Sequence, residues 1–73
     1  MQYKVDFCDY DSDYMRGRFD FLEAQSPQDA FEKAKSMALS NEDIRQIIER
    51  HKRPGKFGCR IVYDYMNGFL NYI

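Results

Sequence analysis

The segment Ser26-Pro27-Gln28-Asp29 constrains the fold more than any other part of the chain, because it marks the start of a helix. Ser26 is a good N-cap, Pro27 suits the first helical position, and Asp29 supplies an acidic group three residues after the cap. Apolar residues then recur at the helical period, at Ala30, Phe31, Ala34, Met37 and Ala38. We therefore predict a helix that begins at Pro27 and packs an alanine-rich face closely against a sheet.

Two runs before this helix are typical of strands. Tyr3, Val5 and Phe7 alternate with polar residues, which predicts a half-buried strand over residues 2–8. A second alternating run covers residues 16–21. Residues 9–13 between them are rich in turn formers with acidic side chains. We expect an antiparallel hairpin with a long acidic connection.

A second helix is expected directly after the first. Residues 40–43 repeat the pattern of a cap followed by acidic residues, and Ile44, Ile47 and Ile48 follow at helical spacing. Pro54-Gly55 would end this helix, because proline restricts the residue before it and glycine favours a turn.

The last part of the chain predicts another hairpin. Residues 57–66 alternate, and Asn67-Gly68 is the strongest short-range signal for a hairpin turn. A two-residue loop at this position would pair Met66 with Phe69. One face of the hairpin would then face the core, and the opposite face would carry Val62, Met66, Phe69 and Ile73.

Together these elements predict a single α+β domain spanning residues 1–73. We expect a four-stranded, mostly antiparallel sheet made of two β-hairpins, with two consecutive helices on one face, in the order β-β-α-α-β-β. A sheet covered on one face leaves the other face in water. Contiguous apolar side chains there would mark a contact surface. The candidate protein-interaction residues are therefore Val62, Met66, Phe69 and Ile73.

The size of the chain argues against an enzyme. A domain of 73 residues buries only about 60% of its unfolded surface, which leaves little room for a deep cleft. The sequence contains no nucleotide-binding loop, nucleophile elbow or paired metal-binding histidines. We expect a non-enzymatic interaction module that binds another protein, or a second copy of itself to form a homodimer, through the C-terminal hairpin.

Weak nucleic-acid binding is the alternative function. The formal net charge is −1, yet basic residues concentrate in the segment 50–60. Aromatic residues lie among and beside them, a mixture typical of surfaces that bind single-stranded nucleic acid. The candidate nucleic-acid-binding residues are Arg50, Lys52, Arg53, Lys56 and Arg60.

The chain offers little basis for a metal or cofactor, and we expect neither. Asp9, Asp11, Asp13 and Asp20 follow part of a calcium-loop spacing, but Tyr14 occupies the position where that loop requires glycine. A solvated acidic turn is the simpler interpretation.

We expect a cytoplasmic protein without membrane contact. The sequence has no apolar run of about 18 residues, and its first residues do not resemble a signal peptide. Cys8 and Cys59 are expected to be reduced thiols, because small disulfide-stabilised domains carry more cysteines.

Overall fold

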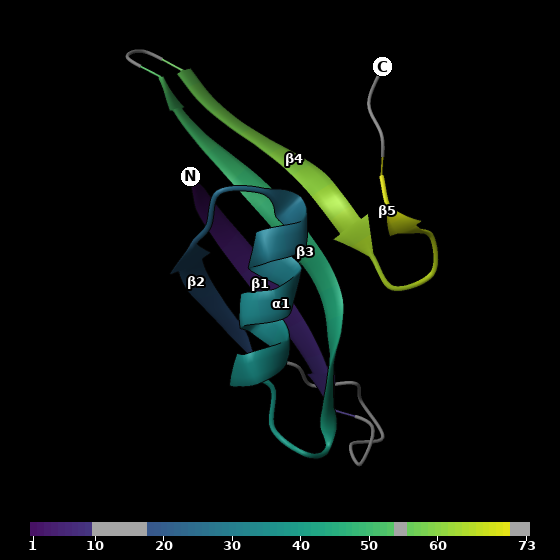
Figure 1. Ribbon diagram of the computed structural model, residues 1–73. Coiled ribbons are helices and arrows are strands. Elements are labelled where there is room, and N and C mark those ends of the chain that lie inside the picture. Colours follow the sequence, from purple (N-terminus) through teal and green to yellow (C-terminus); the bar gives the residue numbers. More distant parts are fainter. Residues whose placement is uncertain (10–17, 54–55, 71–73) are drawn as a thin grey trace.

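The computed structural model describes residues 1–9, 18–53 and 56–70, with side chains for all of these except 51–53 and 56–57. The elements in chain order are β1 (Gln2–Asp9), β2 (Phe19–Glu23), α1 (Pro27–Met37), β3 (Glu42–Arg53), β4 (Lys56–Asp64) and β5 (Gly68–Phe69). The strands form one five-stranded sheet in the order β2-β1-β3-β4-β5, and every neighbouring pair is antiparallel. Helix α1 lies across one face of this sheet (Figure 1).

The predicted first helix is confirmed, together with its start. The Ser26 hydroxyl accepts a hydrogen bond from the Asp29 N–H at 3.1 Å, and Pro27 occupies the first turn. The Asp29 carboxylate accepts a hydrogen bond from the Gln25 N–H at 3.1 Å, which provides this backbone donor just before the helix with a partner. Ala30 and Ala34 are fully buried. Their small side chains allow the helix backbone to approach the sheet closely.

The predicted fold class is wrong in two respects. The segment Glu42–Arg53 is strand β3, so the structure has one helix among the described residues and not two consecutive ones. The sheet consequently has five strands instead of four. The predicted pairing of the first two strands is confirmed, because β1 and β2 are antiparallel neighbours with Val5 opposite Asp20.

A β-bulge explains why β3 resembles a helix in sequence. Asp6 pairs with Gln46, but the next residue, Phe7, pairs with Ile44, so β3 contains one extra residue at this point. The extra residue allows Ile44 and Ile47, three positions apart, to face the core from the same side of the strand. A spacing of three is the spacing that also predicts an amphipathic helix.

The C-terminal hairpin has a different loop from the one expected. The Asn67 N–H donates to the Asp64 carbonyl at 3.1 Å, and Gly68 follows with a positive φ of 73°. The loop therefore comprises the three residues 65–67, and β5 begins with Gly68 in a left-handed conformation. Tyr63 therefore pairs with Phe69, and the predicted pairing of Met66 with Phe69 is wrong. The register changes by an odd number of residues, which moves Phe69 to the face that carries Tyr63.

The core lies between α1 and the two central strands. Tyr3, Val5 and Phe7 of β1 and Ile44 and Ile47 of β3 each expose 1% of their surface or less. Burial of a large apolar side chain contributes about 1.5–3 kcal/mol. The remaining buried members of this cluster are Ala24, Ala30, Ala34 and Val62.

Arg18 connects three parts of the chain at the end of the core. Its Nε lies 3.0 Å from both carboxylate oxygens of Glu42, and its Nη2 donates to the Met37 carbonyl at 2.7 Å. The guanidinium also lies 4.3 Å from the centre of the Phe7 ring. Glu42 accepts a further hydrogen bond from the Leu39 N–H at 2.9 Å. Arg18, which directly precedes β2, thus connects this strand to the end of α1 and to the start of β3.

Candidate interaction site

The structure does not bring the predicted protein-interaction residues onto one exposed face. Val62 is 2% exposed and belongs to the core. Met66 is 76% exposed in the turn before β5, and Phe69 is 40% exposed. Ile73 lies outside the described residues. The predicted surface is therefore divided between the core and the tip of the hairpin.

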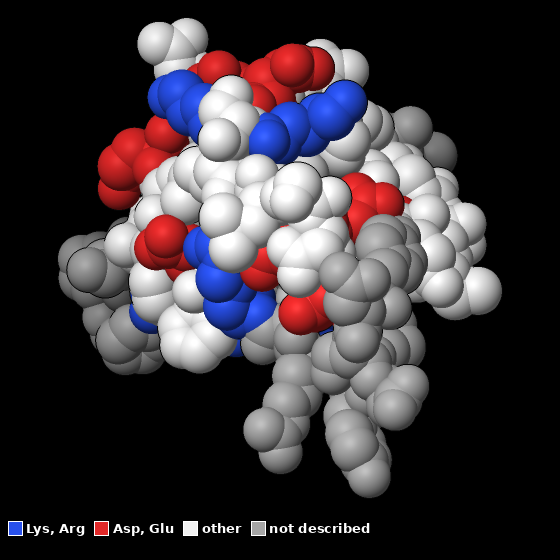
Figure 2. All heavy atoms as spheres, turned by 90° about the horizontal axis from the view of Figure 1, so that it is seen from below, with Lys and Arg blue, Asp and Glu red and all other residues white. Residues whose placement is uncertain are grey.

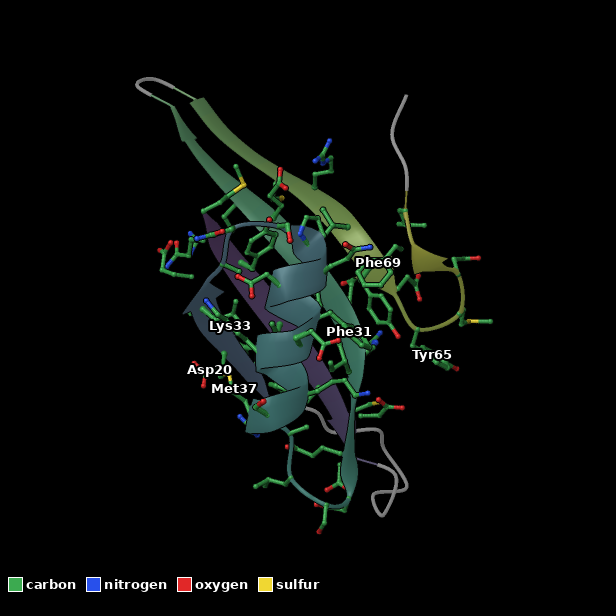
Figure 3. All side chains as sticks on the ribbon, in the orientation of Figure 1. Asp20, Phe31, Lys33, Met37, Tyr65 and Phe69 are labelled. Atoms are coloured by element: carbon green, nitrogen blue, oxygen red, sulfur yellow. The ribbon has the colours of Figure 1, made fainter. Side chains whose placement is uncertain are left out.

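Phe69 is part of a cluster of three rings. Its centroid lies 5.5 Å from that of Phe31 and 5.2 Å from that of Tyr63, and the latter two rings are 4.8 Å apart. Figure 3 shows Phe31 and Phe69 directed toward each other, while Tyr65 is turned outward. Such contacts join β5 to the helix-covered side of the sheet. Phe69 thus has a structural role in docking the short strand β5.

A shallow pocket lies beside this ring cluster. Its volume is about 190 Å³, and it is lined by Pro27, Gln28, Phe69 and Leu70. Pockets that enclose an ordinary small-molecule ligand measure about 300–1,000 Å³. The pocket is smaller than this range, and among its described lining residues only Gln28 has a polar side chain.

The predicted nucleic-acid-binding residues are separated by the sheet. Arg60 lies opposite Glu49 and forms an ion pair with it at 3.2 Å, whereas Arg50, the neighbour of Glu49 in β3, faces the other side. The side chains of Lys52, Arg53 and Lys56 lie outside the described part of the structure. Figure 2 shows the end of the molecule away from the β3–β4 tip, where basic and acidic side chains lie next to each other.

Among the described residues, Glu49 is the one charged residue that is buried, with 4% of its surface exposed. It lies in register between Tyr3 and Arg60. Burial raises the pKa of the Tyr3 hydroxyl, and the adjacent Glu49 carboxylate, which accepts its hydrogen bond, raises it further. The carboxylate is therefore satisfied by two neighbours and has a structural role.

The sheet face opposite α1 carries two exposed aromatic residues on the neighbouring strand β2. Phe19 and Phe21 lie on this face because they alternate with Leu22, which packs against the core. They are 59% and 41% exposed, and their centroids are 5.8 Å apart in an edge-to-face arrangement. We call Phe19, Phe21, Lys4, Ile48 and Arg50 the aromatic face.

Two cations flank the rings of the aromatic face. The Lys4 ammonium lies 4.8 Å from the Phe19 centroid, and the Arg50 guanidinium lies 5.0 Å from the Phe21 centroid. Lys4 also forms an ion pair with Asp6 at 3.6 Å. Arg50 donates to the neutral Gln2 side chain at 3.3 Å, and no described carboxylate lies within ion-pair distance of it. The aromatic face therefore combines exposed rings with one cation that lacks a described acidic partner.

The sequence contained the signal for this site, but it was not assigned to a face. Phe19 and Phe21 are two residues apart, so any strand containing them places both on one side. Sequence reasoning did not predict which side the helix covers. The alternation of residues 57–66 predicts the exposed face on the C-terminal hairpin, but the register of that hairpin differs from the expected one.

The described residues show no other chemical centre. No three of the described His, Cys, Asp and Glu side chains are grouped so that they could hold a metal ion. Cys8 is buried and Cys59 is exposed, and both are free thiols. Within the described ranges, no helix combines the length and apolar character needed to cross a membrane.

Comparisons with protein-family models, with curated proteins and with solved structures find no match for this chain. Its function must therefore be argued from its own geometry.

Proposed function

We propose that the chain is a small, non-enzymatic protein-interaction module that binds a protein partner on the aromatic face. The observation that supports this most directly is the pair Phe19 and Phe21, two adjacent rings that are 59% and 41% exposed on a sheet face that the one described helix does not cover. Aromatic side chains are enriched among the residues that contribute most to protein binding.

The charges of the aromatic face favour a partner with an apolar group next to an acidic one. The apolar group would rest on the two rings. The acidic group would pair with Arg50, whose described hydrogen-bond partner is the neutral side chain of Gln2. Pairing with a partially desolvated guanidinium provides orientation as well as affinity.

A nucleic-acid partner is less well supported by the same charges. Lys4 is already paired with Asp6, and Glu23 lies on the same face at the end of β2. Nucleic-acid affinity depends mainly on several cations that contact phosphates. The aromatic face has only two cations, and the net charge of the chain is −1.

We place the activity in the cytoplasm, a proposal supported by the two free thiols, since a reducing compartment keeps cysteines in this state.

The test compares a double variant with a control. Phe19→Ser/Phe21→Ser removes both rings, and Met66→Ser removes another exposed apolar side chain far along the chain. Partners are captured from native extract with and without nuclease, identified by mass spectrometry, and purified for measurement of Kd. Loss of an aromatic hot spot commonly costs about 2 kcal/mol or more, so we expect affinity to fall at least about tenfold in the double variant.

The control should bind as the wild type does. Equal binding by the wild type and the double variant would refute the proposal. Recovery of nucleic acid, or a complex that nuclease abolishes, would instead support the alternative function.

A further inference from the structure

β2 is an outer strand, and alternate residues along it have N–H and C=O groups that face away from β1. The hydrogen bonds at the two ends of β2 show which residues these are. The Arg18 carbonyl accepts from the Phe7 N–H at 2.9 Å, and the Ala24 N–H donates to the Met1 carbonyl at 3.0 Å. Because the direction alternates along an antiparallel pair, the residues between them alternate as well. The residues whose N–H and C=O groups face outward are Phe19, Phe21 and Glu23.

Two of these outward groups are hydrogen-bonded to side chains. The Phe21 N–H donates to the Asp20 carboxylate at 2.8 Å, and the Glu23 carbonyl accepts from the Lys33 ammonium at 2.9 Å. Lys33 is held in place by an ion pair with Asp29 at 3.4 Å. Figure 3 shows Asp20 and Lys33 on the β2 side of α1. One cap thus comes from the strand itself and the other from the helix.

We propose that β2 is a self-pairing edge that Asp20 and Lys33 keep closed, and that a second copy of this chain pairs with it when these caps are released. An unpaired strand edge is a template for another strand, and charged side chains are a common means of blocking it. The two caps occupy one donor and one acceptor at the centre and end of this edge.

The sequence of β2 is complementary to itself in one antiparallel register. When the pairing is centred on Phe21, this residue faces its own counterpart, and Phe19 faces Glu23 of the second copy. All these residues have outward backbone groups, so the two strands form a regular ladder. Asp20 then faces Leu22 of the second copy. This arrangement avoids placing like charges directly opposite each other.

The neighbouring register centred on Asp20 would place two carboxylates opposite each other, which is unfavourable. The favoured register also joins the uncovered faces of both sheets. Phe19 and Phe21 of the two copies would then form one continuous aromatic surface. These features identify a second copy as the occupant of the edge.

The test opens the edge by removing both caps. In Asp20→Ala/Lys33→Ala, we expect sedimentation velocity to show a dimer whose Kd is at least about tenfold lower than that of the wild type. Glu32→Ala/Lys35→Ala makes the same change in charge at exposed positions of α1. This control should sediment as the wild type does.

A conservative variant separates capping from charge. Asp20→Asn/Lys33→Arg retains an acceptor oxygen and a donor nitrogen at the two caps, so it should remain as monomeric as the wild type. Association of this variant to the same extent as the alanine variant would overturn the proposal, because capping would then be irrelevant.

Hydrogen exchange locates the interface. In the dimer of the alanine variant, the amides of Phe19, Phe21 and Glu23 should become protected. Adding Phe21→Pro should restore the monomer, because this N–H is not used for pairing with β1 and proline is tolerated on an outer edge. A folded alanine variant that stays monomeric, or dimerises without this protection, would overturn the proposal. If the alanine variant does not fold, Lys33→Ala alone is tested by the same measurements.

Discussion

The contacts of Arg18 predict that its removal destabilises the fold strongly. Arg18→Ala deletes the hydrogen bonds to Glu42 and to the Met37 carbonyl, and also the contact with the Phe7 ring. The side chain of Glu42 is only 6% exposed, whereas that of Arg18 is 38% exposed. The variant therefore leaves a nearly buried carboxylate whose remaining described partner is the Leu39 N–H.

The size of this effect can be estimated from the contacts. Removing one partner of a fully buried ion pair costs about 3–5 kcal/mol, and hydrogen bonds to charged groups contribute about 1.5–3 kcal/mol. Because Arg18 is partly exposed, water can replace part of the interaction, and we expect a loss of about 2–3 kcal/mol. A chain of 73 residues has a total stability of about 4–11 kcal/mol. The loss corresponds to a decrease in Tm of about 10–20 °C.

Urea unfolding followed by circular dichroism measures this loss, and Arg45→Ala provides the control. Arg45 is an exposed arginine, and its substitution should change the free energy of unfolding by less than about 0.5 kcal/mol. The double variant Arg18→Ala/Glu42→Gln should recover part of the loss, because it leaves no unpaired carboxylate at this position. If Arg18→Ala and Arg45→Ala have the same stability, the structural role assigned to Arg18 is wrong.

Three further predictions concern the strands and the turn. Ile47 is fully buried, and Ile48 is half-buried on the other face. Ile47→Ala should therefore lower the free energy of unfolding in urea by about 2–5 kcal/mol, and Ile48→Ala by less than half of that. Equal losses would contradict the strand assignment. Gly68 has a φ of 73°, and the position that a Cβ would occupy is open. Gly68→Ala should therefore lower the free energy of unfolding by about 1 kcal/mol through backbone strain alone. An unchanged free energy of unfolding would argue against this turn. The pKa values of Tyr3 and Tyr63 are raised, chiefly by burial. The contribution of these two tyrosines to stability is therefore complete below the pKa of an unfolded tyrosine, and it is lost as the pH rises through their pKa values in the folded state. Tyr3→Phe should consequently reduce the loss of stability at alkaline pH, as measured by thermal unfolding.

Local signals predicted those parts of the fold that depend on local interactions. Ser26, Pro27 and Asp29 specify the start of α1 within four residues, and the structure contains the bond between Ser26 and Asp29. The alternation of Tyr3, Val5 and Phe7 predicted the buried face of β1 in the same way. Both patterns are read without knowledge of what the element pairs with.

The errors arose where pairing between strands determines the outcome. The spacing of Ile44 and Ile47 fits either a helix or a bulged strand, and the choice depends on pairing with β1. Asn67-Gly68 fits either of two hairpin loops, and the packing of Phe69 against Phe31 accompanies the longer one. The location of the aromatic face likewise depends on which side of β2 the helix covers. Each of these choices is made by contacts between residues distant in sequence.

The central claim is that Phe19 and Phe21 form the surface through which the chain binds a protein partner. Amide chemical shifts of the isotope-labelled chain, recorded during titration with the captured partner, test it most directly. We expect the largest changes at Phe19, Phe21 and the adjacent Lys4 and Ile48, with little change along the outer side of α1. Changes confined to α1 or to the turn at Met66, with Phe19 and Phe21 unaffected, would contradict it.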